Sequence, residues 1–200
     1  MKYATSRRLG HLYERLPESV PIRRRVARPN AEPDRALATI LFVDIVRSTE
    51  KAARLGDRRW SEVMNHYYTA VRKELRMARG REVVTTGDGI LATFDVPERA
   101  IRCSVAIREA VRTLGLEIRA GLHAGEYKLI GNEVVGLAIH IGARVAAKAG
   151  ASEVLVSSAV RKLVTDSSFR FRDRGVHHLK GVPEKWRLYL AELIFPGGRE

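Results

Sequence analysis

The stretch Ala38-Thr39-Ile40-Leu41-Phe42-Val43-Asp44-Ile45-Val46-Arg47-Ser48-Thr49 decides the fold, because it joins a strand, a carboxylate and a helix start. Its apolar run is rich in β-branched side chains, which is typical of a strand covered on both faces. Asp44 ends that strand, where its carboxylate offers hard oxygen ligands to Mg²⁺ or Mn²⁺. The following helix start offers N–H groups to phosphate oxygens. The alternative is that Asp44 only caps the helix.

The composition indicates one folded domain with a tail. The chain has 200 residues, of which 45% are hydrophobic, and no apolar run approaches the roughly 20 residues that span a membrane. The single cysteine, Cys103, excludes an internal disulfide and favours a reducing compartment, so we expect a cytoplasmic protein.

The strong positive charge points to an anionic partner. The net charge is +13 and the isoelectric point is near 10.4, which suits a nucleic acid, an anionic membrane surface or an anionic small substrate. Residues 1–35 hold nine Lys and Arg against four Asp and Glu, together with four prolines, and are predicted to be a linker or arm. Only Tyr3 and Tyr13 supply aromatic rings there, so nucleic-acid binding ranks low.

The remaining periodicity predicts alternating helices and strands. Ser48 or Thr49 is expected to cap a short helix that Gly56 closes, and Asp57 to start a longer one. The other expected helices begin at Pro97, Leu137 and Ser157 or Ser158. The expected strands are 81–86 and 89–94 as a hairpin, 116–123, 126–130, 153–157, 169–171, 176–179 and 186–193. This order predicts an α+β fold with a mixed, mainly antiparallel sheet.

A second carboxylate, Asp88, stands at the tip of the hairpin between Gly87 and Gly89. A plain turn role is the alternative, because Asp is common in turns. If the hairpin and the opening strand are neighbours, Asp44 and Asp88 point into one space. Two carboxylates completed by substrate phosphates are the usual way in which a protein holds Mg²⁺.

These residues carry a family resemblance. The chain resembles the catalytic domain of class III adenylate and guanylate cyclases. The matching stretches are Phe42–Thr49, Thr85–Gly89, Arg119–Glu126, Gly136 with Ala143–Val145, and Leu179–Gly181. The resemblance implies a ferredoxin-like βαββαβ core, its mainly antiparallel sheet flanked by helices, over residues 36–195. Residues 1–35 would then be the basic arm and 196–200 a tail.

The resemblance also implies roles for individual residues. Two Mg²⁺ or Mn²⁺ ions would be held by Asp44, Asp88 and the Ile45 carbonyl, and the backbone of Ile45, Val46, Arg47, Ser48 and Thr49 would bind the β- and γ-phosphates. Arg144, supplied by the second subunit of a homodimer, matches the arginine that stabilises the transition state. Lys180 matches a lysine that contacts the triphosphate.

Three positions depart from the family pattern. Val84 stands where adenylate cyclases have the lysine that recognises the base, and Glu133 where they usually have an aspartate. His140 replaces the transition-state asparagine, one helical turn before Arg144. We therefore expect a purine nucleotide cyclase, with ATP ahead of GTP as substrate, that is weakly active or poorly selective. The alternative is a pseudo-cyclase that serves signalling as a nucleotide-binding or dimerisation module.

Overall fold

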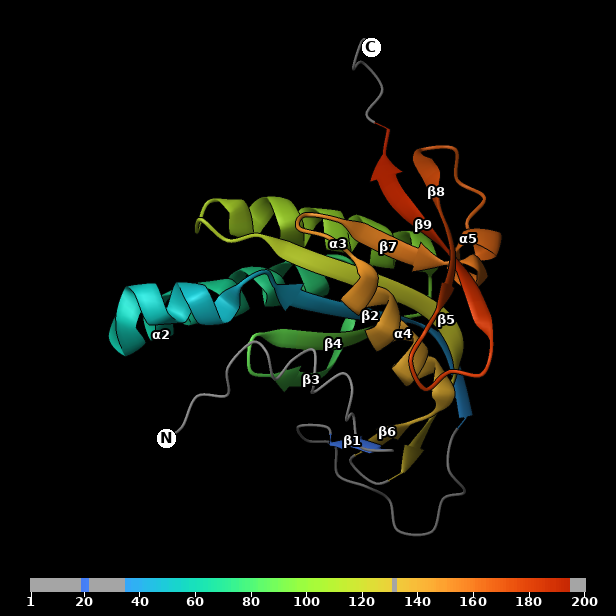
Figure 1. The fold of residues 1–200 in the computed structure, drawn as a ribbon, viewed down its shortest axis with the longest axis horizontal. Helices are drawn as coiled ribbons and strands as arrows, with labels where there is room; N and C mark the ends of the chain where they lie inside the picture. Colours follow the sequence, from blue (N-terminus) through green and yellow to red (C-terminus); the bar gives the residue numbers. More distant parts are fainter. Residues whose placement is uncertain (1–18, 22–34, 131–132, 195–200) are drawn as a thin grey trace.

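The computed structural model describes residues 19–21, 35–130 and 133–194, which form a long twisted sheet with helices on both faces (Figure 1). The strands are β1 (Ser19–Pro21), β2 (Arg35–Ile45), β3 (Arg81–Thr86), β4 (Gly89–Phe94), β5 (Ile118–Ile130), β6 (Glu133–Val135), β7 (Val154–Ser157), β8 (Phe169–His178) and β9 (Lys185–Leu193). The helices are α2 (Ser48–Met77), α3 (Pro97–Arg112), α4 (Leu137–Lys148) and α5 (Ser158–Leu163). Within this described part, no helix is both long and apolar enough to cross a membrane.

The strand order along the sheet is β3-β4-β2-β5-β7-β9-β8, with β6 paired to β5 and β1 paired to β6. The β5–β7 pair is parallel, and the other pairs are antiparallel. The predicted α+β fold with a mainly antiparallel sheet is therefore confirmed. The opening strand β2 lies in the middle of the sheet, which explains its unbroken apolar sequence.

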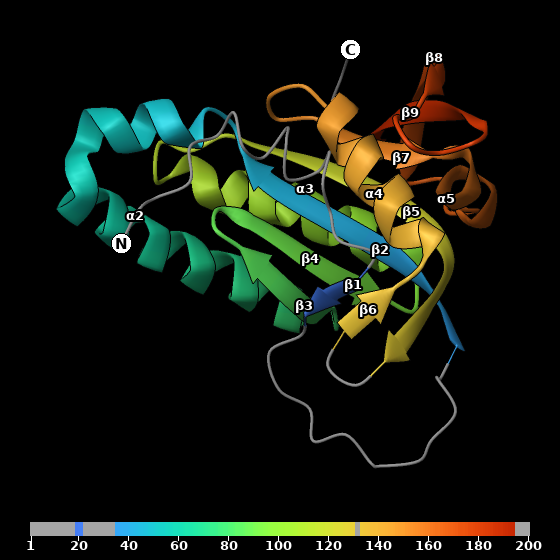
Figure 2. The same cartoon turned by 60° about the horizontal axis from the view of Figure 1, so that its bottom comes forward.

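Alternation along β2 divides the core into two layers. Leu41, Val43 and Ile45 pack with α2 and α3, while Ile40 and Phe42 pack with α4. Figure 2 shows α3 and α4 on opposite sides of the sheet. Because side chains alternate along a strand, Asp44 lies on the face that α4 covers.

Helix α4 packs close to the sheet because its contact face is made of small residues. A Cβ atom on Gly121 would lie 2.1 Å from the Ala146 backbone nitrogen, and one on Gly142 would lie 3.2 Å from Ile40 Cγ2. Only glycine fits at Gly121, since real Cβ atoms do not approach backbone atoms so closely. The Ala- and Gly-rich sequence of α4 is thus a packing requirement.

Several predicted boundaries were wrong. Ser48 and Thr49 do not cap α2; the N-cap position is Arg47, in the left-handed region at φ 54°, without a side-chain cap bond. The two predicted halves of α2 are present and meet at a non-helical Gly56.

The strands also run longer than their sequence patterns indicate. The expected strands 116–123 and 126–130 form the single strand β5, because β2 pairs with it over a long continuous register. The expected strands 169–171 and 176–179 form one strand, β8, whose register shifts between Asp173 and Val176. The Ser157 hydroxyl does not cap α5 but lies 2.9 Å from His123 Nδ1.

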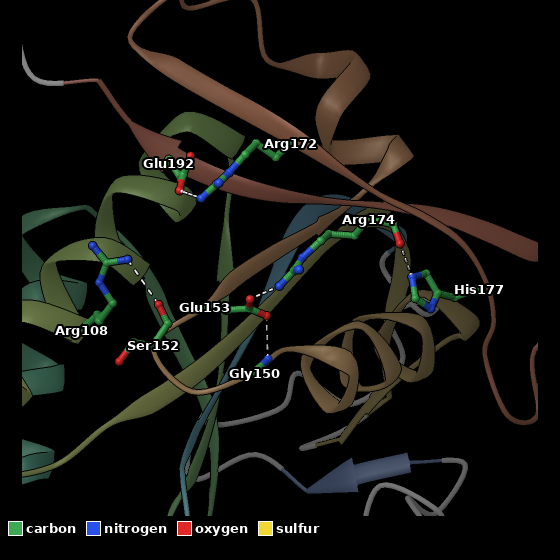
Figure 3. A network of polar contacts seen from close by, with 8 residues as sticks. All are labelled: Arg108, Gly150, Ser152, Glu153, Arg172, Arg174, His177 and Glu192. Atoms are coloured by element: carbon green, nitrogen blue, oxygen red, sulfur yellow. Dashed lines mark hydrogen bonds and ion pairs between the residues drawn. The ribbon is translucent and has the colours of Figure 1, made fainter. Parts of the chain in front are cut away.

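Ion pairs link the edge strand β8 to β9 and to the residue that precedes β7 (Figure 3). Arg172 pairs with Glu192, and Arg174 pairs with Glu153. Glu153 also accepts a hydrogen bond from the Gly150 N–H at 2.8 Å. Exposed pairs of this kind contribute only about 0–1 kcal/mol each, but they charge an edge that could otherwise pair with another chain.

The predicted arm has one described segment. Ser19–Pro21 pairs antiparallel with β6, and Pro21 lies opposite Glu133. The rest of residues 1–35 and the predicted tail at 196–200 lie outside the described residues, apart from Arg35, which begins β2.

Candidate active site

Two carboxylates meet where β2 ends. Asp44 is the penultimate residue of β2, and Asp88 lies in the turn that joins β3 to β4. Because β4 pairs with β2 through Val43 and Ile90, the hairpin tip lies beside the end of β2. Asp44 is fully buried and Asp88 is 9% exposed. The structure thus brings together the two aspartates that the sequence singled out.

The two carboxyl groups share an environment that opposes two negative charges. Burial raises the pKa of Asp88 to about 7, and the Asp44 charge contributes to this rise, against a Ser48 hydrogen bond that lowers it. Burial also raises the pKa of Asp44, although Arg119 acts in the opposite direction. A cation between these groups would remove the repulsion.

Each carboxyl group retains an oxygen without a protein partner. Asp44 Oδ1 and Asp88 Oδ2 are buried and accept no hydrogen bond. Among the described residues, no cluster of three or more His, Cys, Asp or Glu side chains could hold a metal. This donor set fits a hard divalent cation that receives its remaining oxygens from a phosphate substrate and water.

Arg119 forms an ion pair with one of the two carboxylates, and no function was predicted for it from the sequence. It lies directly opposite Asp44 in the β2–β5 pairing. Its Nε and Nη2 both donate to Asp44 Oδ2, at 2.9 and 2.5 Å. The available signal was the stretch Arg119–Glu126, but only the strand register shows that Arg119 faces Asp44.

The predicted phosphate-binding turn is short and strained. The Val46 N–H already donates to Glu117 O at 2.8 Å, so this donor belongs to the sheet rather than to a ligand. Arg47 adopts a left-handed conformation, which costs a non-glycine residue roughly 1–2 kcal/mol. Ser48 then starts α2, and its hydroxyl interacts with Asp88. The positive end of α2 is therefore directed toward the carboxylate pair.

Two adjacent tyrosines of α2 hold the hairpin tip, and sequence reasoning missed both. The Tyr67 hydroxyl donates to the Asp88 carbonyl at 3.2 Å, and the Tyr68 hydroxyl donates to the Gly87 carbonyl. Tyr67 is fully buried. Burial raises the pKa of Tyr68 to about 12, with a further contribution from the Asp88 charge, so this hydroxyl stays protonated.

A salt bridge supports the tyrosine contact. The Arg72 guanidinium lies 5.2 Å from the centroid of the Tyr68 ring and donates to both carboxylate oxygens of Glu82, at 2.9 and 3.0 Å. Since Glu82 belongs to β3, this pair ties α2 to the hairpin that carries Asp88.

The other predicted catalytic residues form a separate group. Arg144 Nε donates to the Lys180 carbonyl at 3.0 Å, which joins α4 to the turn after β8. The residues of α4 that contact the sheet are Ala138, Ile139, Ile141, Gly142, Ala143, Val145 and Ala146. At 100° per residue, His140 and Arg144 lie on the opposite face of the helix. Both side chains are therefore directed away from the sheet face that holds Asp44 of the same chain.

The positions predicted to recognise the base lie on two different strands. Val84 is in β3, half-buried, and packs against the core layer beneath α4. Glu133 opens β6 and pairs with Ile130 and with Pro21. Neither position belongs to the Asp44–Asp88 pair.

This fold and this carboxylate pair define a nucleotide cyclase domain of class III. The chain belongs to that family: residues 32–192 match the model of the adenylate and guanylate cyclase catalytic domain. The chain is 25% identical over 164 residues to a Rhizobium meliloti protein named as a candidate adenylate cyclase, and the match covers 74% of this chain and 27% of the relative.

Solved cyclase structures share the fold. The adenylyl cyclase CyaB from P. aeruginosa superposes with a TM-score of 0.76 at 21% identity, over 81% of this chain and 96% of that one. The guanylate cyclase domain from Catenaria anguillulae, solved in complex with GTP, has a TM-score of 0.72 at 18% identity, over 80% and 97% of the two chains. The chain spans only about a quarter to a third of the length of the first curated relatives.

Proposed function

We propose that the chain is a purine nucleotide cyclase that converts ATP, and less readily GTP, into the 3′,5′-cyclic monophosphate and pyrophosphate. The observation that carries this proposal is the buried pair of Asp44 and Asp88, each with an oxygen that no protein group satisfies. In the reaction, the 3′-oxygen forms a bond to the α-phosphorus, the bond from that phosphorus to the bridging oxygen of the departing pyrophosphate breaks, and the hydroxyl proton passes to water.

Asp44 and Asp88 are the residues that would hold Mg²⁺ or Mn²⁺, with the Ile45 carbonyl as a further donor. Such an ion would activate the 3′-hydroxyl and neutralise the polyphosphate. The N-terminus of α2, from Arg47 to Thr49, offers N–H groups and a positive dipole to the β- and γ-phosphates. Arg119 favours the charged form of Asp44 beside them.

Arg144 would stabilise the charge that grows on the phosphoryl oxygens, and Lys180 would contact the triphosphate. Because Arg144 and His140 are directed away from the sheet face of their own Asp44, we infer that they serve the carboxylate pair of a second copy. The working unit would then be a homodimer with its sites at the interface. His140 would donate the hydrogen bond that an asparagine gives in the family pattern.

Selectivity for the base would be poor. Val84 has no polar atom with which to recognise a purine edge, so Glu133 alone would distinguish the two purines. A site rejects a wrong substrate mainly because its buried polar groups are then left without hydrogen-bond partners, and this site has few such groups. Two of the departures from the family pattern, Val84 and His140, favour the second candidate function, a nucleotide-binding module without turnover.

The test is to incubate the purified chain with ATP or GTP and either Mn²⁺ or Mg²⁺, and to measure cyclic product by mass spectrometry. We expect slow turnover that Asp44→Asn and Asp88→Asn each abolish while the fold is retained. Nucleotide binding without product, at concentrations where a dimer is present, would reject the enzyme and leave the binding module.

A further inference from the structure

A cavity of about 530 Å³ lies between the two halves of α2 and the tip of the β3–β4 hairpin. The halves diverge at Gly56, whose φ of 75° and ψ of 161° interrupt the helix, and Figure 2 shows the resulting bend. The volume falls within the roughly 300–1,000 Å³ of typical small-molecule sites. Ser48 and Thr49 of the proposed phosphate-binding turn and the proposed metal ligand Asp88 line one end of this cavity, whereas none of the residues assigned to base recognition or to the transition state does.

The cavity has apolar walls and a negative charge. Trp60, Met64 and Tyr68 form the large apolar surfaces, and Asp57 and Asp88 supply carboxylates. Its lining, taken over the part of the chain that the structure describes, contains no lysine or arginine. The whole chain, in contrast, carries 36 Lys and Arg against 23 Asp and Glu. The charged side chains of the cavity are thus opposite in sign to the net charge of the protein, so a cation is favoured there when no metal ion is bound at Asp88.

One of these carboxylates is unsatisfied. Asp88 is 9% exposed, and its Oδ2 is buried without a hydrogen-bond partner. A buried carboxylate oxygen of this kind attracts a cation or a hydrogen-bond donor. Aromatic faces on the walls attract cations as well, because the ring quadrupole is negative over the face.

We propose that this cavity binds an organic ammonium ion with an aryl body, the ring lying against Trp60 and Met64 and the ammonium directed to the carboxylates. The size of the cavity suits a single ring with a short chain. In the absence of a metal ion, neutral molecules of the same shape would gain the apolar contacts but not the attraction between charges, and anions would be repelled.

Occupation of the cavity would affect the carboxylate pair by two routes. The ammonium would compete with a metal ion for Asp88. The occupant would also touch Tyr68, whose hydroxyl holds the Gly87 carbonyl at the hairpin tip. This inhibitory consequence rests on the proposed function, whereas the binding itself does not.

The experiment titrates the full chain, in EDTA, with phenethylammonium chloride, 2-phenylethanol and 3-phenylpropanoate, which share a ring and differ in charge. Calorimetry gives the affinities, and Trp60 fluorescence in a Trp186→Phe background reports the site. We expect the cation to bind roughly tenfold more tightly than the alcohol and the anion not to bind.

Variants locate the site. Asp57 and Ala53 are exposed residues of the lining, so the fold should tolerate changes there. Asp57→Asn should weaken the cation severalfold without affecting the alcohol, and Ala53→Trp should abolish both by filling the cavity. Asp95→Asn, at an exposed aspartate outside the lining, is the matched control and should change nothing.

Equal binding of the three probes, no binding of the cation, or full binding to Ala53→Trp would each overturn the proposal. Mn²⁺ should weaken the cation, because both would use Asp88. A chain that binds the cation but forms no cyclic nucleotide would count against the proposed function alone. A chain that forms cyclic nucleotide but ignores the cation would count against the cavity alone.

Discussion

Arg119 lies directly across the β2–β5 pairing from Asp44, and two of its nitrogens donate to a single oxygen, Asp44 Oδ2. The other oxygen, Oδ1, is buried without a partner. One side of the carboxylate is therefore neutralised by the protein, and the other remains available to a cation. The side chain of Asp44 is 1% exposed and that of Arg119 is 27% exposed, so the pair is well shielded from water.

Removal of Arg119 should destabilise the protein and make it depend on metal. Arg119→Ala leaves a buried charge unpaired, which costs about 3–5 kcal/mol of unfolding free energy in comparable pairs. Urea unfolding in EDTA measures this loss. Because a cation can replace the guanidinium, Mn²⁺ should raise the midpoint of the variant more than that of the wild type.

The matched control is Arg58→Ala, which breaks an ion pair with Glu62 whose side chains are 94% and 60% exposed. It should change stability by less than about 1 kcal/mol, with no added response to Mn²⁺. An Arg119→Ala protein as stable as Arg58→Ala would contradict the role given to the ion pair.

The tyrosine contacts predict a change in metal affinity without a change in fold. Tyr68→Phe removes only the hydroxyl that holds the Gly87 carbonyl, so Asp88 should be less well positioned. We expect Mn²⁺ to bind severalfold more weakly, measured by electron paramagnetic resonance without nucleotide. The matched control is Tyr189→Phe, which changes a half-buried tyrosine of β9, far along the sheet from the hairpin. Unchanged affinity in Tyr68→Phe would reject a positioning role.

The elements that the sequence predicted well are those whose pattern is local. The apolar run of β2 and the Gly-Asp-Gly turn of the β3–β4 hairpin each determine their own structure. Pairing of β2 with β4 then places Asp44 beside Asp88. The carboxylate pair was therefore predictable from two short stretches.

The remaining site residues depend on relationships that no local pattern contains. Arg119 is 75 residues from Asp44 in the sequence and meets it only through strand register. Tyr67 and Tyr68 belong to a helix whose periodicity predicts packing alone, and their hydroxyls gain a role only where the hairpin tip reaches them. The Ser48 cap was predicted from a general preference, but its hydroxyl interacts with Asp88 instead.

His123 predicts the response of stability to acid. It is 3% exposed, and burial lowers its pKa to about 4, from 6.5 in the unfolded chain. Between these values the unfolded chain binds the proton and the folded chain does not, so stability falls as the pH drops from about 6.5 to 4. The loss should be on the order of 3 kcal/mol, by the 1.4 kcal/mol that each pKa unit represents.

His123→Gln removes this titration while it keeps a polar group near Ser157. The wild type and the variant share the Asp44–Asp88 pair, so the difference between their unfolding curves across about pH 4–7 isolates the histidine. A difference that does not change with pH would show that His123 is protonated to the same extent in both states.

Val84 predicts a gain of function. Val84→Lys introduces a donor for the purine edge at a half-buried position of β3, where a lysine can extend its amine to the surface. We expect cyclic AMP formation to rise at least roughly tenfold, because a site that pairs a polar group discriminates strongly. Val84→Leu, similar in bulk and without a donor, should not raise it. Equal rates for the two variants would reject this position as the weak element of base recognition.

Mixing two inactive variants tests whether the site is shared between copies. Asp44→Asn removes the carboxylate pair, and Arg144→Ala removes the arginine on the outer face of α4. If both groups served one chain, every mixed dimer would remain inactive. If they come from different copies, each mixed dimer has one intact site. An equal mixture should then recover about a quarter of wild-type activity, because half of the dimers are mixed and each carries one site of two. The control is a chain that carries both Asp44→Asn and Arg144→Ala, which should restore no activity when it is mixed with either single variant. Recovery that depends on subunit exchange between the two single variants, and that the double variant does not give, would establish that Arg144 acts on the partner's carboxylates.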